Sequence, residues 1–248
     1  MVVLSEKAIS VAEGRVVDEA CIKPSFTAKL IARVWMRVIW GYLLAPLCHL
    51  SQTTTSRLRS YPLREGAAHK QLALSYAGLL QALRHGSEGG IDVSNLPCSL
   101  AALPLEDAHR IADSILRFLC QSGAAELTVL IVDSDKTYSW QGVHISPRTS
   151  SIPGIVSLGV FAYVLGRVLR LRPRSTPIAQ AGKPLNTEDA LSAAALANKA
   201  RGSGSGGTAW DMSQRFGVGL TGVTWEFLST VKHFPIVIVR KINSRGSD

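Results

Sequence analysis

The chain has 248 residues, of which 46% are hydrophobic and 18% are charged. This composition excludes a disordered chain and indicates a globular protein of one large domain or two small ones. Twenty-seven Lys and Arg residues exceed eighteen Asp and Glu residues, which gives a formal net charge of +9. That excess favours an anionic partner, but charge alone leaves phosphates, a nucleotide, nucleic acid and a membrane surface open.

The cysteine spacing argues against two common kinds of site. Cys21, Cys48, Cys98 and Cys120 contain no C-x-x-C pair, so the spacings of zinc fingers and redox motifs are missing from the sequence. The simplest interpretation is reduced, mostly buried thiols in a cytoplasmic protein.

Neither a signal peptide nor a membrane span is expected. Acidic residues interrupt the first twenty positions. The apolar segment Ala28 to Leu50 is broken by Lys29, Arg33 and Arg37, and Ile152 to Leu165 is shorter than the roughly 20 residues that cross a bilayer. We therefore expect no membrane partner.

The first predicted element is a short strand at Val2 to Leu4. Because this strand starts almost at the first residue, we expect the natural protein or its relatives to carry another element upstream. Thr27 to Leu44 is predicted to be a helix whose Lys29, Arg33 and Arg37 form one basic stripe at i, i+4 and i+8. Such a stripe is typical of a solvated face, but it also suits phosphates or a partner.

Two more helices are predicted in the next part of the chain. Ser51 to Arg64 is polar and basic and is interpreted as a loop or a broken helix, whereas Gly66 to Arg84 has apolar residues at helical spacing. His69 has no partner at i+4, so we interpret it as structural and not as a metal ligand. A glycine-rich turn follows, and Glu106 to Cys120 is predicted to be a third helix.

The most informative stretch is Leu127 to Trp140, which reads LTVLIVDSDKTYSW. Leu127 to Val132 is almost entirely apolar and is β-branched at four positions, which is the pattern of a strand buried on both faces. We expect this strand to end in the polar run Asp133 to Thr137, and Tyr138 to Ile145 to return antiparallel to it.

The last third of the chain gives weaker signals. Ile152 to Leu171 is apolar but rich in glycine, which disfavours a helix. It closes in the densest basic cluster of the chain: Arg167, Arg170, Arg172 and Arg174. Thr187 is expected to cap a helix that runs to about Lys199. Arg201 to Thr208 has the composition of a mobile loop and only a weak signal for a phosphate cradle. Phe234 to Val239 is predicted to be the final strand.

Two short acidic segments, Asp92 to Asn95 and Asp133 to Asp135, carry the chemistry. Oxygen ligands at the carboxyl end of a buried strand are where α/β proteins place a metal or a phosphate. Two carboxylates from different strands suit Mg²⁺ or Mn²⁺, and a nucleotide would supply further ligands. The alternative is a solvated turn in which the Asp and Ser side chains cap the backbone.

Four blocks resemble, in order, the coenzyme F420-0:γ-glutamyl ligase family over most of the chain. They are Ile9-Ser10 with Ala12-Glu13-Gly14-Arg15, Gly90-Ile91-Asp92-Val93-Ser94-Asn95, Val132-Asp133-Ser134, and Phe234-Pro235-Ile236-Val237-Ile238-Val239-Arg240. The second block is the most specific, and the regions between the blocks diverge.

The resemblance implies an α+β protein with mixed β-sheets and flanking helices, in which residues 1–248 form a single catalytic unit. It also implies a homodimer whose cleft lies near the subunit interface. The implied activity is that of a GTP-dependent ligase, with Mg²⁺ or Mn²⁺, which adds L-glutamate to the deazaflavin phospholactate coenzyme F420-0. In that scheme the substrate carboxylate takes the γ-phosphoryl group, and the glutamate amine then attacks the acyl phosphate.

By matched position, the resemblance implies that Asp92, Asp133 and Ser134 are metal ligands and that Asn95 contacts the nucleotide. Glu226, before the last strand, is the candidate for a further metal ligand. Arg148 and the cluster from Arg167 to Arg174 are our own predictions for phosphate contacts, and no catalytic residue is assigned.

The chain departs from the family pattern at its amino-terminal end. It starts after a family strand and loop that touch the nucleotide, and Val11 stands where the family has a nucleotide lysine. Lys7 is expected to reach the same phosphates, although the neighbouring Glu6 would repel them. A substrate-divergent or catalytically silent homologue is therefore an alternative. A nucleic-acid-binding module is disfavoured because the cluster from Arg167 to Arg174 lacks interleaved aromatics.

Overall fold

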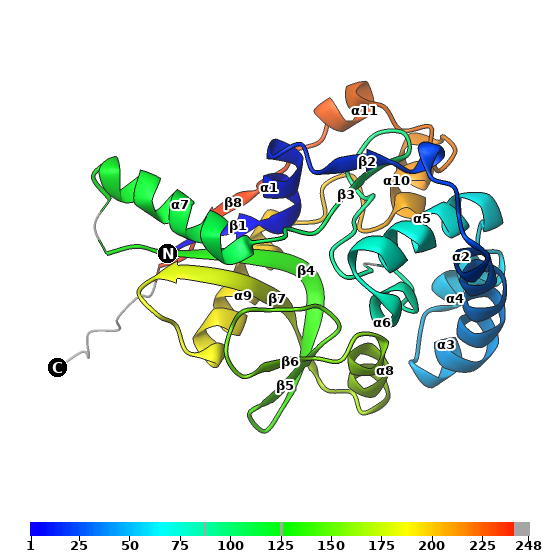
Figure 1. The fold of residues 1–248 in the computed structure, drawn as a ribbon, viewed down its shortest axis with the longest axis horizontal. Coiled ribbons are helices and arrows are strands. Elements are labelled where there is room, and N and C mark those ends of the chain that lie inside the picture. Colours follow the sequence, from blue (N-terminus) through cyan, green and yellow to red (C-terminus); the bar gives the residue numbers. More distant parts are fainter. Residues whose placement is uncertain (87, 125, 241–248) are drawn as a thin grey trace.

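The computed structural model of the protein describes residues 1–86, 88–124 and 126–240. A six-stranded mixed sheet lies at its centre (Figure 1). β1 (Val2–Ser5) is parallel to β4 (Thr128–Trp140) and antiparallel to β8 (Ile236–Ile238), while β7 (Arg172–Gly182) runs antiparallel along β4. The predicted α+β class, with mixed sheets and flanking helices, is confirmed.

The long strand β4 changes partner along one of its edges. Val129 to Val132 pair with β1, whereas Tyr138 to Trp140 pair with β5 (Val143–Ser146), which in turn lies parallel to β6 (Ile155–Ser157). β7 follows β4 on both sides of this change and shifts register between Asp133 and Lys136. The prediction that the strand ends at Asp133 was wrong, because β7 keeps the polar run paired in a bulged form.

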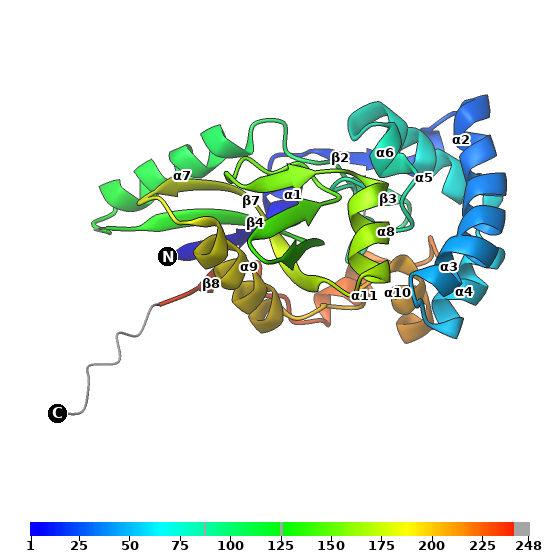
Figure 2. The ribbon, with the colours of Figure 1, turned by 90° about the horizontal axis from the view of Figure 1, so that it is seen from below.

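Two helices cover the opposite faces of the sheet (Figure 2). α9 (Thr187–Arg201) packs its alanines against Leu130 and Val132, and α7 (Ala108–Gln121) packs against Val129 and Ile131. Successive residues of a strand point to opposite faces, so the unbroken apolar run of β4 supplies both cores. The strand is therefore buried on both faces, as predicted, and α7 and α9 fall close to their predicted positions. The amino-terminal cap of α9 is Asn186, one residue before the predicted Thr187.

A smaller antiparallel pair stands beside the main sheet. It consists of β2 (Val16–Asp18) and β3 (Leu100–Ala102), and the short helices α1 (Glu6–Ala12) and η1 (Glu19–Cys21) lie on either side of β2 in sequence. Asp92 extends this pair by a bridge to Ala102, in which each backbone N–H donates to the other residue. This bridge places the first acidic segment next to β3 of the small sheet.

A helical layer covers the other side of the molecule. α2 (Phe26–Leu30), the π-helix η2 (Ile31–Leu44) and α3 (Ala45–Leu47) form one continuous helical run. The layer also contains α4 (Gln52–Arg59), α5 (Leu63–Tyr76), α6 (Leu79–Ala82) and α8 (Val160–Val168). The predicted helix from Gly66 to Arg84 is interrupted, because Gly78 adopts φ +96° between α5 and α6.

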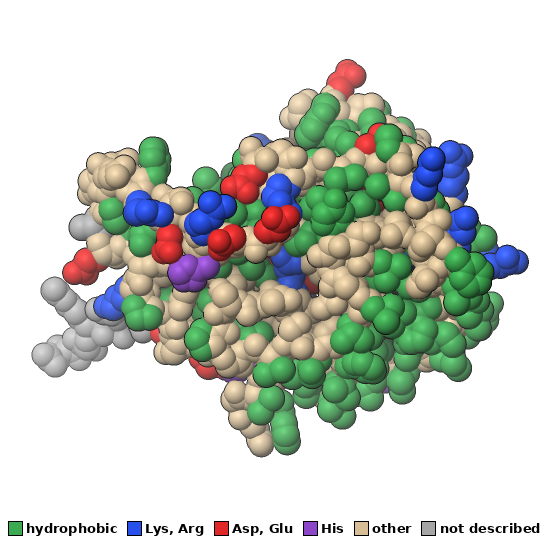
Figure 3. Space-filling model, viewed as in Figure 1, with side chains coloured by type: hydrophobic (Ala, Val, Ile, Leu, Met, Phe, Trp, Pro, Cys, Tyr) green, Lys and Arg blue, Asp and Glu red, His purple; other side chains and the backbone are tan. Residues whose placement is uncertain are grey.

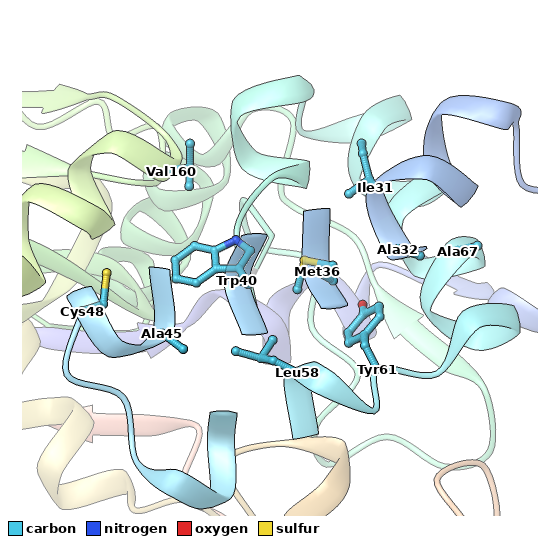
Figure 4. Close-up of a cluster of buried hydrophobic side chains, with 10 residues drawn as sticks. All are labelled: Ile31, Ala32, Met36, Trp40, Ala45, Cys48, Leu58, Tyr61, Ala67 and Val160. Carbon is cyan, nitrogen blue, oxygen red and sulfur yellow. The ribbon is translucent and has the colours of Figure 1, made fainter. Parts of the chain in front are cut away.

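The inner face of η2 forms the core of this layer (Figure 4). Met36 and Trp40 are fully buried against Leu58 of α4 and Val160 of α8. The indole N–H groups of Trp35 and Trp40 both donate to the Leu83 carbonyl, at 2.6 and 2.8 Å. The helical layer is thereby tied to the chain that leads into the first acidic segment.

The run Phe26–Leu47 is also long and apolar enough to cross a membrane by length and composition, with a mean hydropathy of 1.3. Core helices of soluble proteins pass the same test, and about a third of its most apolar stretch (33%) is buried in the protein. Its inner face belongs to the core described above.

The described chain ends with α10 (Ala209–Phe216), α11 (Trp225–Ser229) and β8. All four cysteines are free, as expected, but only Cys48 is buried. The prediction of mostly buried thiols was wrong, because Cys21, Cys98 and Cys120 lie on solvent-facing sides of their segments.

Candidate functional site

The two acidic segments meet at the first turn of α1. β1 ends at Ser5, which pairs with Val132, so Glu6 and Lys7 follow one strand just as Asp133 follows its parallel neighbour. The carboxyl ends of adjacent parallel strands open at the same edge of a sheet. This edge of β4 is where its partner changes from β1 to β5.

Lys7 ties the first acidic segment to this edge. Its Nζ donates to Asp92 Oδ2 at 2.8 Å, to the Ser94 carbonyl at 2.9 Å and to Ser94 Oγ at 3.0 Å. Asp92 Oδ1 accepts from the Ser94 backbone N–H at 2.7 Å and from its hydroxyl at 2.6 Å. Burial alone would raise the pKa of Asp92, but the Lys7 ammonium and the Ser94 hydrogen bonds outweigh it and hold that pKa below its usual value.

Arg148 joins the other acidic groups. It is 5% exposed, its Nη2 donates to Glu6 Oε1, and its Nε lies 3.3 Å from Asp133 Oδ2. The guanidinium also lies flat against Gly90, where a Cβ would come within 1.8 Å of Arg148 Nη1. One buried cation therefore contacts Glu6, Asp133 and the backbone two residues before Asp92.

Glu6 and Asp135 are buried carboxyls on either side of this cation. Burial raises the pKa of Glu6 to about 7 against the opposing attraction of Arg148, and the Leu105 N–H donates to the same carboxylate at 3.0 Å. Burial likewise raises the pKa of Asp135 to about 6, although Arg84 Nη1 donates to it at 2.6 Å. Glu6 thus faces Arg148 inside the protein and not a phosphate, contrary to the expectation from its position.

Asp133 has an oxygen with unused bonding capacity. Oδ2 is buried and makes no hydrogen bond within the described chain, since its approach to Arg148 Nε lacks hydrogen-bond geometry. Oδ1 receives only long contacts, at 3.4 Å, from the Ser134 hydroxyl and the Asp135 N–H. A buried carboxylate oxygen without a donor is costly, and a bound cation or water would satisfy it.

Arg201, at the carboxyl end of α9, lies within electrostatic reach of both acidic segments. Burial lowers its pKa, and the negative charges of Asp133 and Asp92 oppose that effect. Its Nη2 donates to Asn198 at 2.7 Å. Arg201 was predicted to lie in a mobile loop. Its position near the two acidic segments was missed, because no local pattern connects it to residues more than sixty positions earlier.

Asn95 holds the glycine-rich loop that follows Arg201. Its Oδ1 accepts from the Ser205 N–H and hydroxyl, both at 2.6 Å, and its Nδ2 donates to the Ser203 and Gly206 carbonyls. Asn95 itself has φ +55°, a conformation that Asn tolerates better than most residues. The loop therefore lies beside the Asp92 segment, and the predicted nucleotide contact of Asn95 stays a prediction.

The other predicted site residues lie apart from this cluster or have different partners. Ser134 is exposed beside Asp133, whereas Glu226 is exposed in the first turn of α11, and its predicted role as a metal ligand stays a prediction. Arg167 donates to the carbonyls of Cys48 and His49, and Arg174 is buried against Glu188. Arg167 and Arg174 therefore have internal partners, whereas Arg170 and Arg172 are exposed, so the cluster does not act as one group.

A cavity of about 160 Å³ opens beside Asp92 and Ser94. Tyr61 and Trp210 form its aromatic side, and His69 lies at its far end between Glu19 and Glu88, at 2.5 and 2.8 Å. Burial alone would lower the pKa of His69, but the two carboxylates raise it to about 10. A cation held in this way fits the structural role expected of His69.

The described residues include no group of three or more His, Cys, Asp or Glu side chains that could hold a metal. Asp133 fits a divalent cation, since Oδ2 is buried without a donor and the Ser134 hydroxyl is next to it. Both carboxylate oxygens of Asp92 already accept hydrogen bonds. Asp92 can therefore bind a metal only if Lys7 moves away from it.

The mixed sheet and the edge at which Lys7, Asp92 and Asp133 meet are those of an α+β protein with a polar, charge-lined site. The family profile of the F420-0:Gamma-glutamyl ligases matches residues 1–208, and the chain belongs to this family. The chain is also 34% identical over 187 residues to an uncharacterized protein of Methanocaldococcus jannaschii. That match covers 73% of this chain and 64% of the archaeal protein, so the chain spans less than two thirds of its relative's length.

Proposed function

We propose that the protein is a GTP- and divalent-metal-dependent ligase that joins the carboxylate of coenzyme F420-0, a deazaflavin phospholactate, to the amine of L-glutamate. Membership of the ligase family supports the reaction class. The observation that carries the site is the buried Asp133 Oδ2, which lies beside Arg148 without a hydrogen bond, while Lys7 pairs with Asp92 in the other acidic segment.

In this proposal Asp133 and Ser134 hold Mg²⁺ or Mn²⁺, and Asp92 joins them when Lys7 turns from its carboxylate to the nucleotide phosphates. The metal would neutralise phosphate charge while the substrate carboxylate takes the γ-phosphoryl group. The glutamate amine would then attack the acyl carbon of this acyl phosphate, form the amide and expel inorganic phosphate. Arg148 would hold Asp133 in place, and the positive charge of Arg201 would offset the charges of Asp92 and Asp133.

The same proposal gives the aromatic cavity beside Asp92 to the acid substrate and includes a homodimer and a cytoplasmic location. Two features support the assignment of the cavity: its position next to Asp92 and its aromatic side formed by Tyr61 and Trp210.

Calorimetric titration with GTP in the presence of Mn²⁺ tests the proposal. We expect binding by the wild-type protein and its loss in both Asp92→Ala and Asp133→Ala. Asp113→Ala, in a partly exposed carboxylate of α7 that pairs with His109, serves as the matched control and should bind normally. Unchanged binding in both aspartate variants would rule out this metal site.

A catalytically silent homologue is the alternative that one observation favours. Lys7, Arg148 and Arg201 already neutralise the acidic segments without any metal. In that case neither GTP nor Mn²⁺ would bind to the wild-type protein. A nucleic-acid-binding module has less support, because Arg167 and Arg174 make internal contacts.

A further inference from the structure

The outer face of the helical layer exposes an unusual amount of apolar surface. Seven large hydrophobic side chains of the run Phe26–Leu47 are 42% to 80% exposed: Phe26, Leu30, Val34, Val38, Tyr42, Leu43 and Leu47. Three more lie on α8 and are 43% to 62% exposed: Phe161, Leu165 and Leu169. We call these ten residues the apolar face.

The two parts of the apolar face are physically joined. Val160, Tyr163 and Val168 of α8 pack in the same core as the inner side of η2, and Arg167 holds the end of α3 through the Cys48 carbonyl at 3.0 Å. Figure 3 shows hydrophobic side chains gathered over the lower right of the molecule, where α3, α6 and α8 lie in Figure 1. Contiguous apolar surface of this kind marks an interaction site.

The charges carried by the segments of the apolar face are basic, although Glu19 and Glu65 line a pocket together with Lys29 and Arg33. The sequence from Lys23 to Arg64 contains seven Lys and Arg residues and no Asp or Glu, and the stretch from Lys136 to Thr187, which includes α8, also lacks acidic residues. Lys29 and Arg33 are exposed among the apolar residues of α2 and η2. The Arg59 guanidinium lies 4.4 Å over the ring of the exposed Tyr42.

We propose that the apolar face, with its basic rim, binds the surface of an anionic lipid bilayer. Apolar side chains interleaved with Lys and Arg are what an interfacial helix presents to acidic headgroups and to the acyl boundary beneath them. The inner side of η2 stays in the protein core, so the helix lies on the membrane and does not cross it. This inference departs from the expectation of no membrane partner and is independent of the proposed ligase activity.

A second copy of the chain is the competing occupant, and charge disfavours it. A two-fold contact places the same patch on both sides, so the mostly basic rims of two copies would face one another. Opposed like charges destabilise such an interface, whereas anionic headgroups neutralise the same rim.

Vesicle co-sedimentation of the full chain tests the proposal. We expect binding to vesicles that contain phosphatidylglycerol, little binding to pure phosphatidylcholine, and release in 1 M salt, where the Debye length falls to about 3 Å. Lys29→Gln and Arg33→Gln should each weaken binding about fivefold, and together about thirtyfold. Val34→Asp with Val38→Asp should abolish binding.

Matched controls lie on α7, away from the apolar face. Phe118 is 68% exposed and Arg117 is exposed, so Phe118→Asp and Arg117→Gln should bind vesicles as the wild type does. Circular dichroism melts confirm that each variant is folded. Absence of binding to any vesicle would overturn the proposal. A dimer that Val34→Asp with Val38→Asp converts to a monomer, without vesicle binding, would assign the face to a second copy instead.

Discussion

The Lys7 ammonium lies 2.8 Å from the Asp92 carboxylate, although the two residues are 85 positions apart in sequence. Lys7 follows the first strand of the main sheet, whereas Asp92 belongs to the extension of the small sheet. This ion pair holds together two parts of the chain that are built on separate sheets. It also occupies the carboxylate that a divalent cation would need.

Replacing Lys7 should therefore separate metal binding from nucleotide binding. In Lys7→Met the Asp92 carboxylate loses its cation, so Mn²⁺ affinity without nucleotide should rise by about tenfold, since a charge pair at this distance contributes at least a kcal/mol near a protein surface. GTP affinity should fall, because the phosphates lose the same ammonium. Electron paramagnetic resonance of free Mn²⁺ measures the first effect and calorimetry the second. The exposed Lys23→Met variant is the control, and unchanged Mn²⁺ affinity in Lys7→Met would contradict the competition.

Removal of the buried arginine should be among the most destabilising changes in the protein. Arg148→Met leaves Glu6 and Asp133 without their shared cation, which costs about 3–5 kcal/mol of unfolding free energy for a buried pair. Urea denaturation of Arg148→Met, Glu6→Gln and the double variant should show that the second change recovers part of the loss. Arg170→Met, in an exposed arginine, should stay within about 0.5 kcal/mol of the wild type. Additive losses in the double variant would show that Glu6 and Arg148 are not coupled.

Gly90 should tolerate no side chain. A Cβ there would meet Arg148 Nη1 at 1.8 Å, and φ is +97°. Gly142 has a similar φ of +85° but nothing within 4 Å of its Cβ position. Gly142→Ala should cost about 1 kcal/mol from backbone strain alone. Gly90→Ala should cost about 3 kcal/mol or more, since it also displaces the buried guanidinium. Equal thermal melting temperatures for the two variants would show that Arg148 does not pack against Gly90.

The contributions of Glu6 and Asp135 to stability should fall as the pH rises from about 4.5 to about 7, against an opposite contribution from buried His85, whose pKa is lowered to about 3. Burial raises the pKa of Glu6 to about 7 and that of Asp135 to about 6, so the folded protein keeps protons that the unfolded chain releases. Their contribution is complete below the unfolded pKa values and is lost as the pH passes the folded ones, with a slope approaching about 1.4 kcal/mol per pH unit for each group. Urea midpoints measured from pH 4 to pH 8 should have a more negative slope with pH in the wild type than in Glu6→Gln. The exposed Glu13→Gln is the control, and a decline that is equally steep in Glu6→Gln would disprove the assignment.

The sequence predicted the parts of the fold that depend on local pattern. The β-branched run before Asp133 gave the buried strand, and helical spacing gave α7 and α9 to within two residues at most ends. The end of β4 could not be predicted, because β7 holds the polar run in the sheet from about forty residues further along the chain. The break at Gly78 was also missed, since a single glycine is tolerated inside many helices.

The site was predicted only as separate pieces. Asp92 and Asp133 stood out because each is an acidic residue in a short polar segment after an apolar one. Lys7 and Arg148 were predicted to contact phosphates and not these carboxylates, and Arg201 was missed, because the three cations come from distant elements. Glu6 was read as a group that faces a phosphate, whereas the fold turns it inward to Arg148. The chemistry of a residue follows from its neighbours in space, and sequence spacing did not reveal these neighbours.

The bulge in β4 fixes the number of residues between its two halves. Tyr138 is buried, and Trp140, two residues further along the strand, is exposed at the end of the hairpin. The register that begins again at Lys136 sets the face of the sheet on which each side chain lies. Insertion of one residue between Asp133 and Lys136 would leave the pairing with β1 intact but invert every side chain that follows, turning Tyr138 away from α8. In homologues that keep this sheet, the length of the hairpin tip at residues 141–142 should therefore vary freely, whereas the length of the acidic segment should be constant.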